Sequence, residues 1–128
     1  MNYLKYFKND TLFDGNDNFF KKYIKKSYIY GEYGCGQSTY WVLKNTNVKI
    51  YSVDTSKHWI NKLHKSKLTS KDRIDLKLIN LGKIESWGYP VNYSKRDNFY
   101  KYTNWIWTQS ELPDTILIDG RFRICCFF

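Results

Sequence analysis

Apolar residues along this chain follow two spacings, one typical of helices and one typical of strands. The segment 19–26 carries its aromatic and aliphatic residues at helical spacing, whereas the segment 27–33 is rich in Tyr and Ile and ends at glycines. The change from helical to strand spacing is repeated along the rest of the chain. In chain order the pattern predicts a helix over 19–26, a strand over 27–33, a helix over 38–45, a strand over 48–54, a helix after Ser56, a strand over 73–81, a helix within 82–113 and a strand over 115–119.

Alternating strands and helices predict a layered α/β fold with right-handed crossovers. The apolar run 115–119, TILID, is typical of a strand buried on both faces of a parallel sheet. Within 82–113, the spacing of Phe99, Tyr102 and Ile106 predicts the packed face of a crossover helix, and Trp87 to Pro90 form a loop or turn. We therefore expect a Rossmann-like three-layer sandwich with a mainly parallel sheet, in a single domain over residues 1–128.

Composition supports one folded domain and indicates the cellular compartment to expect for it. Of 128 residues, 42% are hydrophobic and 20% aromatic, enough to build a core and unlike a disordered chain. No run of 18 apolar residues occurs, and the N-terminus has no apolar segment of signal-peptide length, so we expect no membrane span. Three cysteines, Cys35, Cys125 and Cys126, cannot all pair, which favours a reducing compartment and a cytoplasmic location.

The chain is basic, with 21 Lys and Arg against 12 Asp and Glu and a net charge of +9. Such a charge attracts polyanions. The lysines are scattered in local pairs, however, and the abundance of Lys, Asn, Tyr and Ile indicates a compositional bias. The net charge still leaves an alternative function, a non-catalytic basic module that binds nucleic acid or another polyanion in a salt-dependent way and needs no cofactor.

Candidate chemistry centres on the turn after the first expected strand, EYGCGQST, residues 32–39. Closely spaced glycines between a strand and a helix let a ligand approach the backbone. Gly34 and Gly36 fill the first two glycine positions of the dinucleotide-binding motif, but Thr39 occupies the third. A fragment of a nicotinamide-dinucleotide-binding dehydrogenase is thus a second alternative, which leaves Glu32 unexplained.

Two carboxylates at strand ends indicate the kind of ligand. Glu32 lies near the end of the first strand, where we expect its side chain to face the ligand crevice and to suit a cationic group. Asp54 ends the second strand, where a carboxylate can accept both hydroxyls of a ribose. Together they predict a nucleoside that carries a positive centre.

These motifs resemble those of the class I S-adenosylmethionine-dependent methyltransferases. Their first motif, acidic-x-Gly-x-Gly, matches residues 32–36, their ribose-binding acid matches Asp54, and an acid at the end of the fourth strand matches Asp119. The segments NLGKIESWGYP and LIDGRFRICC are also similar to a methyltransferase-like subgroup of unknown acceptor. The resemblance implies the strand order 3-2-1-4, S-adenosyl-L-methionine as cofactor and methyl transfer to an acceptor.

The resemblance also implies residue roles. The backbone at Gly34 and Gly36 would contact the amino-acid part of the cofactor, Glu32 its ammonium and Asp54 its ribose. The expected cofactor-binding residues are Glu32, Tyr33, Gly34, Gly36, Ser38, Asp54, Thr55, Asn80, Leu81 and Asp119, with Asn80 and Leu81 beside the adenine. Asp119 is also the expected catalytic residue, as a polar group beside the reacting centre. The expected substrate side, suited to an anionic methyl acceptor, comprises Trp87, Tyr89, Arg121 and Arg123.

Structural roles compete with several of these assignments. Glu32 and Asp119 could instead pair with nearby arginines or lysines. His58 and His64 lie at a spacing that does not share a helix face, so we expect both to be exposed and no metal site. Cys35 is interpreted as a small residue that fits the turn, because no partner that would activate a thiol is evident.

The strand count departs from the family pattern. A complete fold of this family has seven strands, whereas this sequence supplies four before the segment 124–128. We therefore expect an incomplete domain, which puts catalysis by this chain in question more than its fold. The apolar C-terminal edge predicts self-association.

Overall fold

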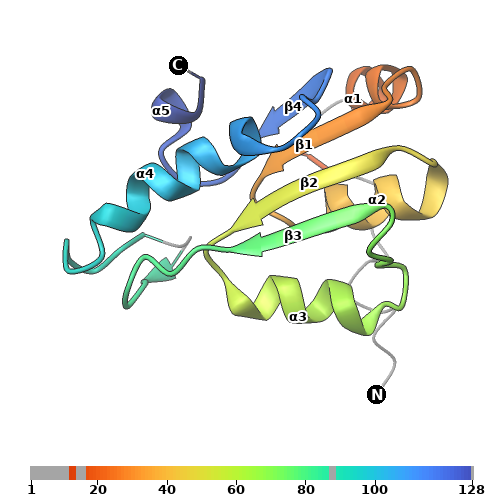
Figure 1. Ribbon diagram of the computed structural model, residues 1–128. Helices are drawn as coiled ribbons and strands as arrows, with labels where there is room; N and C mark the ends of the chain where they lie inside the picture. Colours follow the sequence, from red (N-terminus) through yellow and green to blue (C-terminus); the bar gives the residue numbers. More distant parts are fainter. Residues whose placement is uncertain (1–11, 14–16, 87–88, 128) are drawn as a thin grey trace.

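The described residues form a four-stranded parallel sheet at the centre of the fold (Figure 1). The computed structural model describes residues 12–13, 17–86 and 89–127. The strands lie in the order β3-β2-β1-β4, as expected. They are β1 (Ile29–Tyr33), β2 (Lys49–Asp54), β3 (Ile74–Leu78) and β4 (Thr115–Ile118). The helices are α1 (Asn18–Ile24), α2 (Gln37–Asn45), α3 (Lys57–Lys65), α4 (Asp97–Asn104) and α5 (Arg123–Phe127), with a 3-10 helix, η3 (Trp105–Thr108), after α4.

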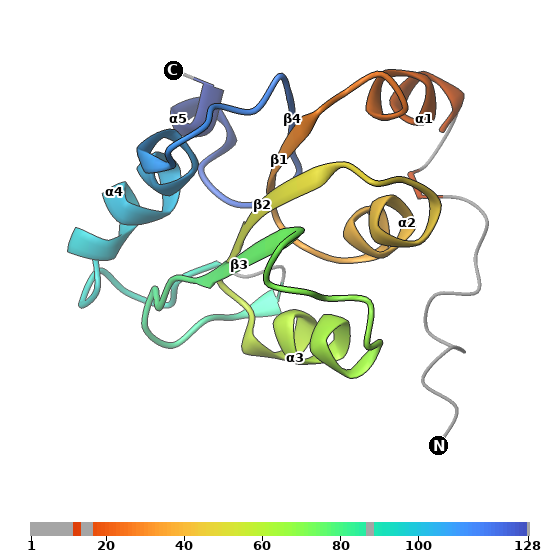
Figure 2. The ribbon, with the colours of Figure 1, turned by 45° about the vertical axis from the view of Figure 1, so that its right-hand side comes forward.

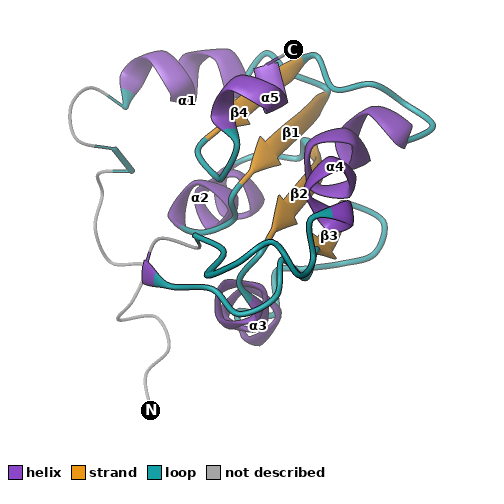
Figure 3. Cartoon of the chain, turned by 90° about the vertical axis from the view of Figure 1, so that its left-hand side faces the viewer, coloured by secondary structure: helices purple, strands orange, loops and turns teal. Residues whose placement is uncertain are grey.

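Helices cover both faces of the sheet, which gives the three layers that the sequence predicts (Figures 2 and 3). On one face α1, α2 and α3 bury residues such as Ile24, Val42 and Leu63 against the strands. On the other face α4 and η3 bury Tyr102 and Ile106, as their helical spacing predicts, and α5 adds a cysteine. Because both faces are covered, β1 and β2 are almost entirely buried.

The alternation of side chains along β1 decides which of them reach the site. Tyr30 belongs to the core on the α2 side, whereas Tyr33 belongs to the core on the α4 side. Since strand side chains alternate between faces, Glu32 shares the face of Tyr30. Its neighbour across the parallel pairing with β2 is Ser52. The Glu32 carboxylate therefore points under α2, into the interior.

The prediction that the 115–119 strand is buried on both faces is wrong. β4 pairs with β1 and lies at the edge of the sheet, so all four of its residues are only partly buried. Next to it, Ile124 and Phe127 of α5 are 75% and 74% exposed. Self-association through this edge stays a prediction. Within the described residues, no helix has the length and apolar character needed to cross a bilayer.

Candidate functional site

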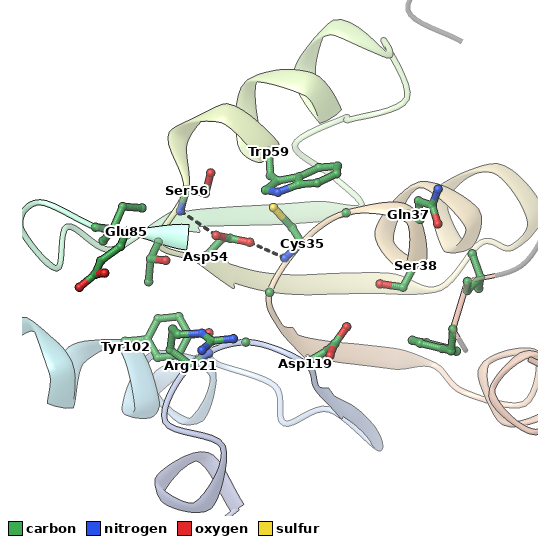
Figure 4. Close-up of a pocket in the computed structure, with 17 residues that line it drawn as sticks. Cys35, Gln37, Ser38, Asp54, Ser56, Trp59, Glu85, Tyr102, Asp119 and Arg121 are labelled. Atoms are coloured by element: carbon green, nitrogen blue, oxygen red, sulfur yellow. Dashed lines mark hydrogen bonds between the residues drawn. The ribbon is translucent and has the colours of Figure 1, made fainter. Parts of the chain in front are cut away.

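The carboxyl ends of β1, β2 and β4 meet around a cavity of about 600 Å³ (Figure 4). In parallel α/β sheets, ligands bind at this edge, where the turns into the helices open. Figure 4 shows Asp119, Arg121 and Tyr102 along one side of the cavity and Trp59 and Ser56 along the other. The lining residues are Leu12, Phe13, Gly34, Cys35, Gly36, Gln37, Ser38, Asp54, Thr55, Ser56, Trp59, Ile84, Glu85, Tyr102, Asp119, Gly120 and Arg121.

Two glycines let the turn after β1 touch the loop after β4. Gly34 has a φ of +92°, and a Cβ atom there would lie 2.8 Å from the Asp119 carbonyl oxygen. A Cβ atom on Gly120 would overlap the Tyr102 hydroxyl and lie 3.0 Å from the Tyr33 carbonyl carbon. Side chains at either position would separate the two segments. This close approach brings Asp119 to the same cavity as the glycine turn.

The backbone N–H groups of residues 34–36, in the glycine turn, have partners within the protein. The Gly34 N–H donates to the Val53 carbonyl over 2.8 Å, and the Cys35 N–H donates to the Asp54 carboxylate over 2.7 Å. The Gly36 N–H donates to the Thr39 hydroxyl over 2.9 Å. Thr39 thus holds the turn at the position where the dinucleotide motif has its third glycine. The N–H groups at residues 34–36 are consequently not available to cradle a phosphate.

Asp54 joins the two turns that border the cavity. One carboxylate oxygen accepts the Cys35 N–H, and the other accepts over 2.7 Å the N–H of Ser56, the residue directly before α3. Asp54 is only 8% exposed, and this burial raises the pKa of its carboxyl, although the backbone donors act in the opposite direction. A carboxylate offers about four acceptor sites on its two oxygens, so Asp54 has the capacity to accept a ligand hydroxyl as well as the N–H groups of the two turns.

The expectation that the Glu32 carboxylate faces the crevice is wrong. It is fully buried and accepts hydrogen bonds from four hydroxyls, those of Tyr30, Ser38, Thr39 and Ser52. Burial raises the pKa of Glu32 to about 7, while the hydroxyl donors lower it. Two of the donors, Ser38 and Thr39, belong to the first turn of α2, so Glu32 holds the start of that helix in place. Glu32 does not line the cavity.

Asp119 lies in the cavity wall and also forms an ion pair. Its carboxylate accepts a hydrogen bond from the Arg123 guanidinium over 3.0 Å, and about half of each side chain is exposed. Asp119 therefore has the structural pairing that the sequence left as an alternative, and it still borders the cavity. Its backbone N–H donates to the Tyr33 carbonyl over 3.0 Å, which continues the pairing of β4 with β1.

The structure brings most of the expected cofactor residues together and leaves four aside. Gly34, Gly36, Ser38, Asp54, Thr55 and Asp119 line the cavity, together with Arg121 from the expected substrate side. Glu32, Tyr33 and Leu81 lie in the interior, and Asn80 is exposed, with its side chain accepting the Gly82 N–H. β3 ends at Leu78, earlier than expected, so Asn80 and Leu81 belong to the loop beyond it. Tyr89 and Arg123 line an adjoining cavity, and Trp87 falls outside the described residues.

The lining residues that sequence reasoning missed include Trp59, Tyr102 and Glu85. Trp59 lies in the first turn of α3, soon after Asp54 in the sequence. That position could have indicated that Trp59 reaches the site. Tyr102 was expected to pack, which it does, but its hydroxyl also accepts the Arg121 N–H over 3.1 Å at the cavity wall. Glu85 lies in the loop after β3, within the segment NLGKIESWGYP, but the resemblance of that segment assigned no role to this residue.

The thiol and imidazole groups have the structural roles expected of them. Burial raises the pKa of the Cys35 thiol far above its usual range, so the thiol is poorly suited to act as a nucleophile. His58 and His64 are both exposed. Across the described ranges, no group of three His, Cys, Asp or Glu side chains could hold a metal ion.

Comparison with solved structures finds a similar protein, a methyltransferase-like protein from Silicibacter pomeroyi. The TM-score is 0.79 at 22% sequence identity, over 94% of this chain. The match spans 66% of the other chain's length. At this identity the likeness shows the fold, which is a methyltransferase-like fold. No protein-family model matches the sequence, and no curated protein does.

Proposed function

We propose that this chain binds S-adenosyl-L-methionine at the cavity and serves in methyl transfer to an acceptor. The observation that carries the proposal is the charge of the cavity wall. Its described lining includes three carboxylates, Asp54, Glu85 and Asp119, against one guanidinium, Arg121. S-adenosylmethionine carries a sulfonium and an ammonium against one carboxylate, so a wall of this sign favours it.

The glycine turn supports the same ligand over a dinucleotide. A pyrophosphate needs free backbone N–H donors, and those of residues 34–36 are already bonded within the protein. An ammonium instead needs acceptors, which the carbonyl oxygens of such a turn provide. The cavity therefore suits the amino-acid part of S-adenosylmethionine better than it suits a dinucleotide.

Each wall then has a role in the proposed reaction. Asp54 has acceptor capacity for ribose hydroxyls, and Trp59 offers an aromatic face for the adenine. Methyl transfer requires alignment and a dry pocket, with a base only when the acceptor atom carries a proton. Asp119 borders the cavity at the tip of β4, where a polar group can orient the acceptor.

Calorimetric titration of the chain with S-adenosylmethionine and with S-adenosylhomocysteine tests the proposal. The two ligands differ by the methyl group and its positive charge, so the acidic wall predicts tighter binding of S-adenosylmethionine. Glu85→Gln removes one wall carboxylate whose side chain is exposed. It should weaken S-adenosylmethionine binding by about threefold to tenfold, the effect of one nearby charge in a solvated site, and affect S-adenosylhomocysteine less.

The matched control is Asp75→Asn, which removes an exposed carboxylate in β3 away from the cavity lining. It should leave both affinities unchanged. Titrations with NAD⁺ and with a single-stranded oligonucleotide test the two alternatives. Failure of a folded chain to bind either adenosyl ligand, or tighter binding of NAD⁺ or the oligonucleotide, would contradict the proposal.

A further inference from the structure

A second cavity of about 270 Å³ adjoins the first one, and Gly120 and Arg121 line both. Its lining consists of Tyr89, Pro90, Gly120, Arg121, Phe122 and Arg123. The walls are therefore two aromatic rings, a proline and two arginines. A molecule that occupied both cavities would pass Gly120, next to Asp119.

The two cavities differ in the sign of their charged walls. The described lining of the large cavity holds three carboxylates and one guanidinium, whereas that of the small cavity holds two guanidiniums and no carboxylate. Arg123 is already paired with Asp119 over 3.0 Å. Of the two arginines in the small cavity, Arg121 is therefore the one whose charge is available to a ligand.

The surroundings of Arg121 hold its guanidinium in place without neutralising it. Its central carbon lies 4.4 Å from the centre of the Tyr89 ring, a stacking distance that restrains the plane of the fork. The Tyr102 hydroxyl fixes the backbone of the same residue by accepting its N–H. In the described part of the chain, no carboxylate lies within ion-pair distance of Arg121. A planar fork held in this way is suited to bidentate binding of an oxyanion.

We propose that the small cavity binds the methyl acceptor through an oxyanion, a carboxylate or phosphate carried on a compact apolar body. This assignment rests on the proposed methyltransferase function, since it takes the large cavity as the cofactor site. The oxyanion meets the Arg121 fork, and the apolar body contacts Tyr89, Pro90 and Phe122. The rest of the acceptor extends past Gly120 toward Asp119, at the border with the cofactor.

Ligand-detected NMR titrations with three probes test the inference. Benzoate and phenyl phosphate supply the two oxyanions on one aromatic body, and benzyl alcohol is their neutral counterpart. Both anions should bind at least fivefold more tightly than benzyl alcohol, and the tighter of the two identifies the oxyanion. Arg121→Gln should abolish that preference, whereas Arg96→Gln, which removes an exposed arginine away from both linings, should retain it.

Each outcome separates this inference from the proposed function. Binding of S-adenosylmethionine without any preference for the anionic probes would overturn the inference and leave the cofactor site intact. Preference for the anions that survives Arg121→Gln, in a variant with an unchanged circular dichroism spectrum, would overturn the assignment to Arg121. Anion binding at Arg121 in a chain that fails to bind S-adenosylmethionine would refute the acceptor role, because the proposed function itself would then fail.

Discussion

The Asp54 carboxylate of β2 accepts a hydrogen bond over 2.7 Å from the backbone N–H of Cys35, in the turn after β1. Its other oxygen accepts the Ser56 N–H at the start of α3 over 2.7 Å. A single side chain thus connects the segments that follow two neighbouring strands. Asp54 consequently shapes the cavity in the free protein, before any ligand is bound, and a loss of binding on substitution needs to be separated from a loss of shape.

Substitution Asp54→Asn should destabilise the folded protein. The amide nitrogen cannot accept a hydrogen bond, so one of the two N–H groups loses its partner in a site that is only 8% exposed. A buried donor left unpaired costs about 1 to 3 kcal/mol. Urea unfolding followed by circular dichroism measures the loss, with Asp75→Asn as the exposed control. Equal stability of the two variants would show that the turns do not depend on Asp54.

The buried Glu32 predicts a pH dependence of stability with a defined sign. Its pKa is about 7 in the folded protein and near 4.5 when unfolded. Between these values the unfolded chain has lost its proton and the folded chain has kept it, so rising pH favours unfolding. The contribution of Glu32 is most favourable below about pH 4.5 and is lost as the pH rises through 7, by on the order of 3 kcal/mol.

The variant Glu32→Gln tests that contribution. Gln cannot titrate, and the surrounding hydroxyls can both donate and accept, so they can bond to its amide. Relative to the wild type, the free energy of unfolding of the variant should rise between pH 4.5 and pH 7 and level off above. A difference that stays constant across this range would mean that the Glu32 pKa is not raised. The Asp75→Asn protein should follow the wild type throughout.

The sequence predicts the fold and the position of the site through local signals that survive folding. Periodicity gives the order of helices and strands, and Gly34, Asp54 and Asp119 stand at strand ends that a parallel sheet brings to one edge. The direction of Glu32 could have been inferred as well, because residues two apart on a strand share a face and the aromatic ring of Tyr30 is a natural core group. The match of Glu32 to the acidic-x-Gly-x-Gly motif instead favoured a side chain that faces the ligand crevice.

Other features depend on packing between distant segments, which no local pattern encodes. Glu85 and Tyr102 reach the cavity from a loop and a helix, and each position follows from how those elements lie on the sheet. The partial exposure of β4, by contrast, agrees with the strand order 3-2-1-4 that the family resemblance implies. Its apolar composition resembles that of a central strand, but its place in the strand order puts it at an edge.

The contact between Gly120 and Tyr102 should be strongly coupled in a double-mutant cycle. A methyl group at residue 120 would overlap the Tyr102 hydroxyl, so Gly120→Ala should cost about 1 to 3 kcal/mol of stability. Removing the hydroxyl with Tyr102→Phe relieves that overlap, although it also removes the acceptor for the Arg121 N–H.

The double variant should therefore be more stable than the sum of the single effects predicts, by on the order of 1 kcal/mol. Chemical denaturation of the four proteins completes the cycle. Strict additivity would indicate that the loop after β4 moves away to accommodate the methyl group. If the loop moves in this way, Gly120→Ala should also weaken oxyanion binding at Arg121, the next residue in that loop.

The three cysteines should differ in reactivity in the folded protein. Cys125 is exposed, whereas Cys35 and Cys126 are buried. Burial raises the pKa of Cys126 to about 12 and that of Cys35 further. Since the thiolate is the reactive form, these raised pKa values slow both buried thiols at neutral pH. Ellman's reagent should therefore titrate one thiol rapidly in the native protein and all three in urea.

The variant Cys125→Ser identifies the rapid thiol, because it should remove the rapid phase and leave the slow ones. If Cys35 reacted as fast as Cys125 in the native protein, the turn after β1 would have to open in solution. Cys35 also lines the large cavity. Saturation with S-adenosylmethionine should therefore slow the reaction of Cys35 further and leave that of Cys125 unchanged, which separates protection by a ligand at the cavity from a general stabilisation of the fold.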